Sequence, residues 1–209
     1  MPFFGKENEK FYYVHIPRTA GRYIRELFLF NNYTAEYDDV FGSYLVNGLI
    51  VSHVHFPFYN YYMNADNYKN FTIVRNPIDK IWSALDIAYK RKKSPHIKDT
   101  FLKDLEDKSF FFDYLDYERS HESYHNNWFR PQIDFVSHRT QIYKYEMRIN
   151  ENFVLWINKT LNLNLNYLQE KRYPRMNEES LYPQKNQITR KIKRNIKDYY
   201  VEDFRKFNY

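Results

Sequence analysis

A short segment near the N-terminus combines a glycine-bearing turn with two arginines. HIPRTAGR, residues 15–22, follows a β-rich apolar stretch and precedes residues whose apolar side chains have helical spacing. Such a turn brings free backbone N–H groups and the positive end of a helix dipole to one point, which attracts anions. Arg18 and Arg22 add two guanidinium groups, whose planar forks match phosphate oxygens. The segment predicts a phosphate-binding loop; the alternative is an ordinary strand–helix turn with surface arginines.

A second segment, TIVRNPIDKIWS at residues 72–83, repeats the pattern of strand, turn and helix. Arg75 ends the predicted strand, Pro77 opens the predicted helix, and Ser83 follows Arg75 by eight residues (83 − 75 = 8). An arginine at the carboxyl end of a strand points into the crevice where α/β folds bind ligands. We therefore expect Arg75 and Ser83 to hold an anion together. The alternative is a surface arginine and an unrelated helix serine.

Both segments resemble blocks of the sulfotransferase family. YVHIPRTAG is similar to the family's loop for the 5′-phosphosulfate, usually written HIPKTAGT, and FTIVRNPIDKIWS is similar to its 3′-phosphate-binding segment. IYKYE (142–146) resembles a family strand that ends in Tyr-Glu, and DYYVEDFRKFNY (198–209) resembles the family's C-terminal segment. The four blocks occur in the family's order, and residues 94–125 are unmatched.

The resemblance implies a donor, 3′-phosphoadenosine-5′-phosphosulfate (PAPS), a product, 3′-phosphoadenosine-5′-phosphate (PAP), and no metal. It also implies a P-loop-like three-layer fold. The residues that it assigns to the donor are Arg18, Thr19, Ala20, Gly21, Arg22, Tyr23, Arg75 and Ser83. Arg18, also expected to act in catalysis, stands where the family has a lysine that stabilises the leaving phosphate. Arg22 and Tyr23 replace a Thr-Ser pair, which exchanges hydroxyl ligands for a second guanidinium.

Two histidines in VSHVHF, residues 51–56, are candidates for the general base. The segment resembles the GHVSF stretch of uronyl 2-O-sulfotransferases, whose histidine is the proposed base. That register makes His53 the base and His55 its neighbour, whereas a shift by two residues makes His55 the base. In an extended segment both side chains lie on one face. The alternative is two hydrogen-bonded histidines at a strand end.

Other polar residues give weaker indications of a functional role. Related enzymes often have a glutamine-bearing helix near the acceptor, but a solvated helix face is the favoured interpretation of Asn126, Asn127, Arg130 and Gln132. Glu146 follows a strand and is expected to support the site or to cap the next helix.

The elements that must position these residues alternate along the chain. Predicted strands cover 11–16, 48–54, 70–75 and 140–146, and predicted helices cover 22–30, 78–93, 126–137 (short), 150–163 and 187–207. Strands that alternate with helices predict an α/β fold in which helices flank a central, mainly parallel sheet on both faces. We expect a single domain over residues 1–209, with 94–125 as an insertion or lid over the active site.

Composition excludes several classes of protein. The 209 residues contain no cysteine, so disulfides, thiolate catalysis and cysteine-based metal sites are excluded. No apolar run approaches the ~18–20 residues that a membrane span needs, and the first residues lack the layout of a signal peptide. We expect a soluble, cytoplasmic protein without a membrane span. The net charge of +6 suits an anionic ligand, without indicating a specific nucleic acid.

These observations predict sulfuryl transfer from PAPS to a hydroxyl, on a carbohydrate or a small molecule. One alternative is a nucleotide kinase of related fold, but the loop lacks the second glycine and the Lys-Ser/Thr pair of GxxxxGK(S/T). A second alternative is a non-catalytic polyanion-binding module, which the net charge, Arg22 and Tyr23 favour.

Overall fold

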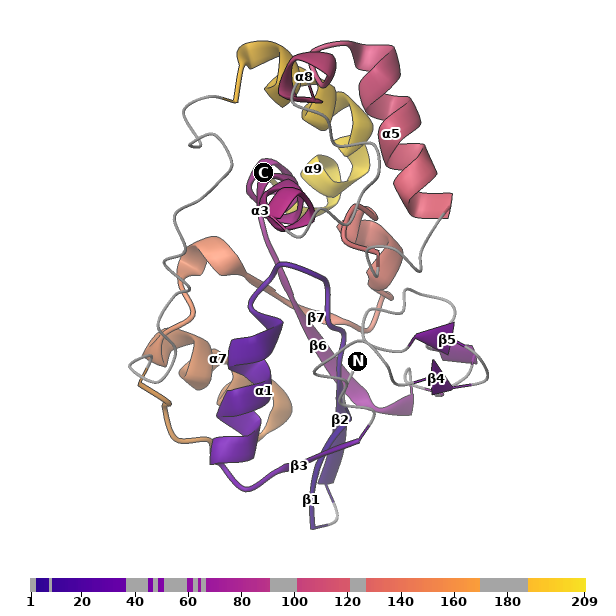
Figure 1. Cartoon of the computed structure of the whole chain (residues 1–209). Coiled ribbons are helices and arrows are strands. Elements are labelled where there is room, and N and C mark those ends of the chain that lie inside the picture. The colour runs from indigo at the N-terminus through magenta and orange to yellow at the C-terminus, as the bar shows by residue number, and fades with distance from the viewer. Residues whose placement is uncertain are drawn as a thin grey trace. The chain divides into compact units, whose positions relative to one another are not determined.

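The structure is a computed structural model, and it describes residues 3–7, 9–36, 45–46, 49–50, 60–61, 64, 67–90, 101–120, 127–169 and 188–209. The chain divides into two compact units, Met1–Arg75 with Gln132–Glu170, and Asn76–Pro131 with Lys171–Tyr209. Within the described residues, the first unit holds the sheet and the second unit is helical (Figure 1). That residues 1–209 form one domain stays a prediction.

The first unit is built on a five-stranded sheet in the order β3-β1-β2-β6-β7. Its strands are β1 (Phe3–Lys6), β2 (Glu9–Tyr13), β3 (Thr34–Glu36), β6 (Lys69–Val74) and β7 (Gln141–Lys144). Its helices and 3-10 turns are α1 (Gly21–Phe30), η2 (Gln132–Phe135), η3 (Tyr145–Met147) and α7 (Glu151–Leu161). A separate two-stranded pair joins β4 (Leu45–Val46) and β5 (Leu49–Ile50).

The α/β class is confirmed, but the sheet is mixed, whereas a mainly parallel sheet was predicted. β2, β6 and β7 pair in parallel, and these are three of the strands expected from apolar runs. β1 and β3 add two antiparallel pairings that were not expected. A tight hairpin joins β1 to β2, with Glu7 at a φ of 54° in its turn. β1 has only four residues, which is too short for its alternation to stand out in the sequence.

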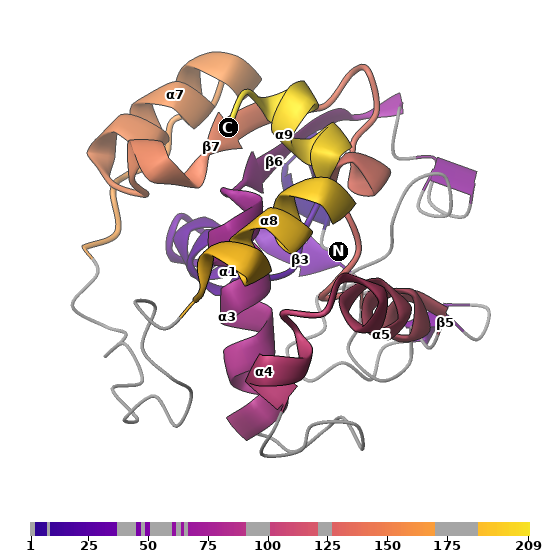
Figure 2. The same ribbon diagram turned by 90° about the horizontal axis from the view of Figure 1, so that it is seen from above.

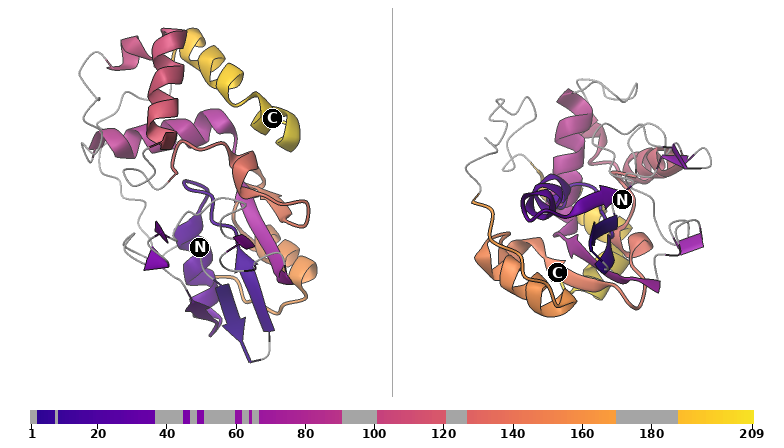
Figure 3. Two further views of the ribbon diagram at one scale, coloured as in Figure 1. Left: turned by 90° about the vertical axis from the view of Figure 1, so that its right-hand side faces the viewer. Right: turned by 90° about the horizontal axis from the view of Figure 1, so that it is seen from below.

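One face of the sheet carries the core of the first unit. Alternate residues of a strand point to the same face, and Phe11, Phe71 and Tyr143 from the three parallel strands share one cluster with α1 and α7. Phe28 of α1 stacks on Phe4 with ring centroids 4.4 Å apart and lies 4.9 Å from Phe11. Both helices therefore lie on the same face of the sheet (Figures 1 and 3).

The second unit contains α3 (Pro77–Lys90), α4 (Phe101–Asp104), α5 (Lys108–Ser120), α8 (Arg190–Tyr199) and α9 (Val201–Phe207). α3 begins at the expected proline, and the Asn76 side chain accepts a hydrogen bond from the N–H of Ile78 at 3.0 Å. α8 packs on α3 and on α5 (Figure 2). The α4 and α5 helices belong to the stretch 94–125, whose role as a lid stays a prediction.

The single helix expected over residues 187–207 is instead two helices that part at Tyr200. Tyr200 is buried and leaves the helical conformation at φ −100° and ψ 28°. Its hydroxyl donates to the carbonyl of Phe129. Because this contact holds the side chain inside the unit, the chain turns at Tyr200 and continues as α9.

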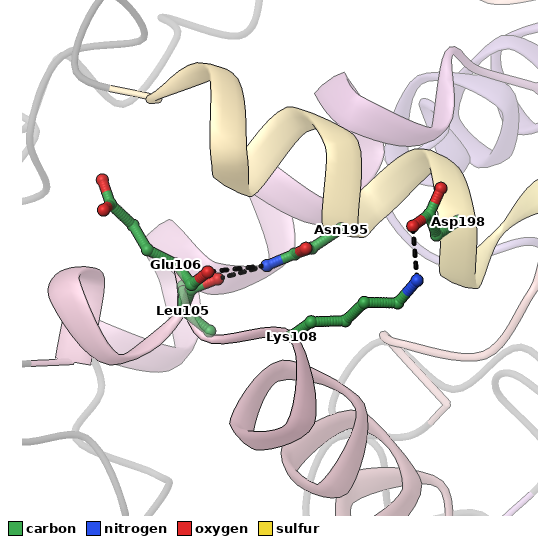
Figure 4. Close-up of polar contacts among 5 residues, drawn as sticks. All are labelled: Leu105, Glu106, Lys108, Asn195 and Asp198. Atoms are coloured by element: carbon green, nitrogen blue, oxygen red, sulfur yellow. Dashed lines mark hydrogen bonds and ion pairs between the residues drawn. The ribbon is translucent and has the colours of Figure 1, made fainter.

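Polar side chains link α8 to the start of α5, as Figure 4 shows. The buried amide of Asn195 donates to the carbonyls of Leu105 at 3.0 Å and Glu106 at 3.3 Å. The Lys108 ammonium lies 2.6 Å from the Asp198 carboxylate and holds the pKa of Asp198 below its usual value.

Replacing Asn195 with alanine is expected to destabilise the protein by about 1–3 kcal/mol, because two carbonyls at a buried helix junction lose their donor. Lys108→Ala is the matched control, since the pair it breaks is partly exposed and contributes less. Urea denaturation of the two variants measures the difference. An equal loss in both would contradict the role assigned to Asn195.

None of the helices in the described part of the chain combines the length and the apolar character that a membrane crossing requires.

Candidate functional site

The loop from residue 14 to residue 20 joins β2 to α1 and folds back on itself. The N–H of Val14 donates to the carbonyl of Phe71 at 2.9 Å, which extends the parallel pairing past the end of β2. Thr19 is fully buried, and its hydroxyl donates to the carbonyl of Ile16 at 2.7 Å. The predicted donor ligand Thr19 therefore shapes the loop from inside.

Two loop residues other than glycine have left-handed backbone conformations. Arg18 has a φ of 68° and Ala20 a φ of 76°. Each such conformation costs about 1–2 kcal/mol for a residue with a Cβ, and strain of this kind persists where the surrounding contacts impose it. It gathers at ligand sites, so it is consistent with the predicted phosphate loop.

The N-terminus of α1 has no side-chain cap. Ala20 is the N-cap residue and makes no side-chain hydrogen bond, and the first turn of the helix holds no acidic residue. The first N–H groups of a helix lack partners within the helix. Ala20 offers these groups no side-chain acceptor, and the helix dipole favours an anion at this end of α1.

Glycine is required at position 21 because the side chain of His15 lies close to its Cα atom. A Cβ built at Gly21 would overlap the imidazole ring of His15, and no left-handed φ is found at this glycine. The His15 ring in turn stacks on Tyr13, with ring centroids 5.4 Å apart. His15 therefore lies against the first residue of α1. His15 was not among the predicted site residues, although its two-residue spacing from Tyr13 could have indicated the contact.

Gly21→Ala is expected to destabilise the protein by about 1–3 kcal/mol, because the added methyl group displaces His15 from the start of α1. Gly5→Ala is the control, since a Cβ there meets its nearest atom, Thr34 Oγ1, at an ordinary 3.6 Å. Thermal unfolding of both variants provides the measurement. If the two substitutions cost the same, the packing of His15 does not explain the glycine.

Arg75 follows β6 and connects the two neighbouring strand ends. Its Nη1 donates to the carbonyl of Arg18 at 3.3 Å, on the loop after β2. Its guanidinium carbon lies 4.7 Å from the ring centroid of Tyr145, the residue after β7. The carboxyl ends of the three parallel strands thus meet around one guanidinium, at the edge where α/β sheets bind ligands.

The Nε atom of Arg75 is buried, and no residue in the described part of the chain accepts a hydrogen bond from it. A buried donor without an acceptor costs about 1–3 kcal/mol. An oxyanion ligand would supply the missing acceptor. Arg75 is therefore both held in place and incompletely satisfied, which distinguishes it from an arginine on an open surface.

Gln132 holds the backbone of Arg75 by two hydrogen bonds. Its Oε1 accepts from the Arg75 N–H at 2.9 Å, and its Nε2 donates to the Arg75 carbonyl at 2.7 Å. Gln132 is fully buried, and Asn127 is 7% exposed, so the expected solvated helix face is wrong for both residues. The segment 132–135 is a 3-10 turn whose first side chain points inward.

Tyr13 contributes a second buried polar atom near the loop. Burial raises the pKa of its phenol, and the neighbouring Thr19 side chain opposes this shift only in part. The buried Tyr13 hydroxyl has no hydrogen-bond partner within the described residues. The phenol therefore stays protonated and neutral at physiological pH.

The other predicted site residues are placed as follows. Arg22 is exposed on α1. The Tyr23 hydroxyl donates to the carbonyl of Leu168 at 3.3 Å, so it supports the segment after α7. Ser83 is half-buried on α3 of the second unit, and its joint role with Arg75 stays a prediction. Glu146 is exposed in η3, and the cap of α7 comes from Asn150.

His53, His55 and Asn126 lie outside the described residues, so the choice of general base stays a prediction. Within the described ranges, no group of three acidic or histidine side chains is arranged to hold a metal ion. Comparisons of the chain with family models, with curated proteins and with solved structures find no match.

Proposed function

We propose that the protein is a sulfotransferase that moves a sulfuryl group from PAPS to an acceptor hydroxyl. The observation that carries the proposal is Arg75, whose buried Nε lacks an acceptor in the described residues and whose Nη1 contacts the loop before α1. The uncapped start of α1 supports an anion at the same strand ends. The two resembling sequence segments supply these same residues.

In this proposal the two phosphate groups of the donor have separate ligands. The loop 15–22 and the N–H groups of α1 hold the 5′-phosphosulfate, and Arg75 with Ser83 holds the 3′-phosphate. The β2–loop–α1 sequence and the parallel pairing of β2, β6 and β7 support a P-loop-like arrangement of this part of the sheet. The antiparallel strands β1 and β3 extend the sheet beyond it.

The transfer step follows from these roles. The acceptor oxygen attacks sulfur in line, the bond from sulfur to the bridging oxygen of the 5′-phosphate breaks, and PAP leaves. His53, or His55 in the other register, takes the proton of the acceptor hydroxyl. The α1 dipole and the Arg18 guanidinium stabilise the charge that develops on the leaving phosphate. The histidine pattern favours a carbohydrate hydroxyl as the acceptor.

The test combines donor binding and transfer. Calorimetric titration is expected to show tighter binding of PAP than of ATP, and sulfur-35-labelled PAPS is expected to label an acceptor in a panel of glycans and small hydroxyl compounds. Preference for ATP would favour a kinase instead. Binding of PAP without transfer to any acceptor in a broad panel would favour a non-catalytic module.

A further inference from the structure

Gln132 occupies an unusual place relative to the predicted donor site. β6 pairs with β7 as far as Val74, opposite Lys144, and the ladder ends there. The next residue, Arg75, carries the guanidinium of the site. The N–H and the carbonyl of Arg75 both bond to one side chain, that of Gln132, at 2.9 and 2.7 Å. The glutamine therefore holds the main chain of the predicted ligand just past the end of β6.

The arrangement fixes Arg75 at both ends. Gln132 holds its backbone, which sets the direction of its Cα–Cβ bond. The Arg18 carbonyl and the Tyr145 ring hold its guanidinium. An arginine ordered before binding loses less conformational freedom when the anion arrives, so its contact contributes more to affinity. If the backbone contact is lost, the guanidinium no longer reaches the same point.

We propose that Gln132 is a positioning residue that sets the specificity of the site for a nucleotide with a 3′-phosphate. This inference rests on the proposed function, since it assumes that Arg75 binds that phosphate. Gln132 bonds the main chain of Arg75, and no contact with the donor is assigned to Gln132 itself. Replacing Gln132 is therefore expected to reduce the preference for nucleotides with a 3′-phosphate and to leave the other contacts with the donor unchanged.

The readout is a ratio of two dissociation constants, Kd for adenosine 5′-phosphate divided by Kd for PAP. The two nucleotides differ by the 3′-phosphate alone, so the ratio isolates its recognition. Gln132→Ala is expected to lower the ratio by about tenfold, through weaker binding of PAP with little change for adenosine 5′-phosphate. Gln132→Met keeps the buried volume and should give the same result in a variant that is more certain to fold.

Thr72→Val is the matched control. Thr72 is also fully buried on β6, and its hydroxyl donates to the carbonyl of Val14 at 2.6 Å. The substitution removes a buried hydrogen bond of the same sheet without touching Arg75. Thr72→Val should lower the unfolding temperature and leave the ratio at its wild-type value. The two Gln132 variants should lower the unfolding temperature and the ratio.

The outcomes separate this inference from the proposed function. A wild-type ratio in both Gln132 variants, with a collapsed ratio in Arg75→Ala, would overturn the role of Gln132 alone. A ratio that Arg75→Ala leaves unchanged would overturn the 3′-phosphate assignment itself. An equal fall in Thr72→Val and in the Gln132 variants would mean that general destabilisation lowers the ratio, and the inference would then be wrong.

Discussion

Arg75→Ala is expected to weaken the binding of PAP about 100-fold, because hydrogen bonds to a charged group contribute about 1.5–3 kcal/mol and each 1.4 kcal/mol is tenfold in affinity. Binding of adenosine 5′-phosphate, which lacks the 3′-phosphate, should change little. The folded state should lose little stability, since the lost contacts with Arg18 and Tyr145 are offset by removal of a buried donor without an acceptor. Calorimetric titration with both nucleotides measures the effect.

Arg139→Ala is the matched control for Arg75→Ala. Arg139 is an exposed arginine of the same unit, so its removal changes the net charge equally. If both variants weaken PAP to the same extent, binding depends on overall charge, as in a polyanion-binding module. A large loss in Arg75→Ala together with wild-type affinity in Arg139→Ala would instead support a specific contact.

Much of the fold could be predicted because the parallel strands are apolar and followed by helices. Residues 69–74 and 141–144 form strands close to the expected ranges, and α1 and α7 follow the expected helical spacing. The strands β1 and β3 were missed. They have four and three residues, which is too few for a periodic pattern to identify them. The pairing of β1 with β3 and the packing of Phe4 on Phe28 join residues distant in sequence.

The break between α8 and α9 shows a different limit. The apolar positions of residues 187–207 continue with helical spacing across Tyr200, so the sequence favours one long helix. The hydrogen bond from Tyr200 to Phe129 joins residues 71 positions apart and overrides that local preference. Such a contact cannot be predicted from the sequence of the helix alone.

The residues of the candidate site also differ in how far the sequence predicts them. Residue types and spacing predict anion ligands in the loop 15–22 and at Arg75, because the chemistry of anion binding restricts both, and these roles stay predictions. They did not identify Gln132, which was expected to face solvent, since a single glutamine after a proline looks the same whether it is exposed or buried. Its partner is 57 residues away, and only the fold brings the two together. Sequence reasoning could thus propose ligands, whereas it could not predict the contact of Gln132 with the main chain of Arg75.

Arg18 stands where the sulfotransferase loop that this segment resembles has a lysine. Arg18 has a left-handed φ, and its carbonyl accepts a hydrogen bond from Arg75. The backbone at this position therefore already links the two predicted phosphate sites, whichever cation its side chain carries. In the proposed function, an arginine at this position changes the cation that meets the leaving phosphate and keeps the loop's hydrogen bond with Arg75.

His53→Ala is expected to lower the rate of sulfuryl transfer by about 10²–10⁴-fold, the usual contribution of a positioned general base. PAP affinity should stay at its wild-type value, because the base contacts the acceptor and not the donor. Transfer from sulfur-35-labelled PAPS under single-turnover conditions measures the chemical step, and calorimetric titration measures the affinity. His55→Ala, prepared in parallel, should show the smaller loss if the register that aligns His53 with the family histidine is correct.

His138→Ala is the matched control for the two histidine variants, since His138 is exposed and belongs to neither predicted segment. It should transfer sulfate at the wild-type rate. If His55→Ala loses turnover and His53→Ala does not, the register shifted by two residues is the correct one. Full activity in both variants would exclude a histidine base in this segment. Loss of PAP affinity along with turnover would mean that the segment acts on the donor site, and the base assignment would then have to be abandoned.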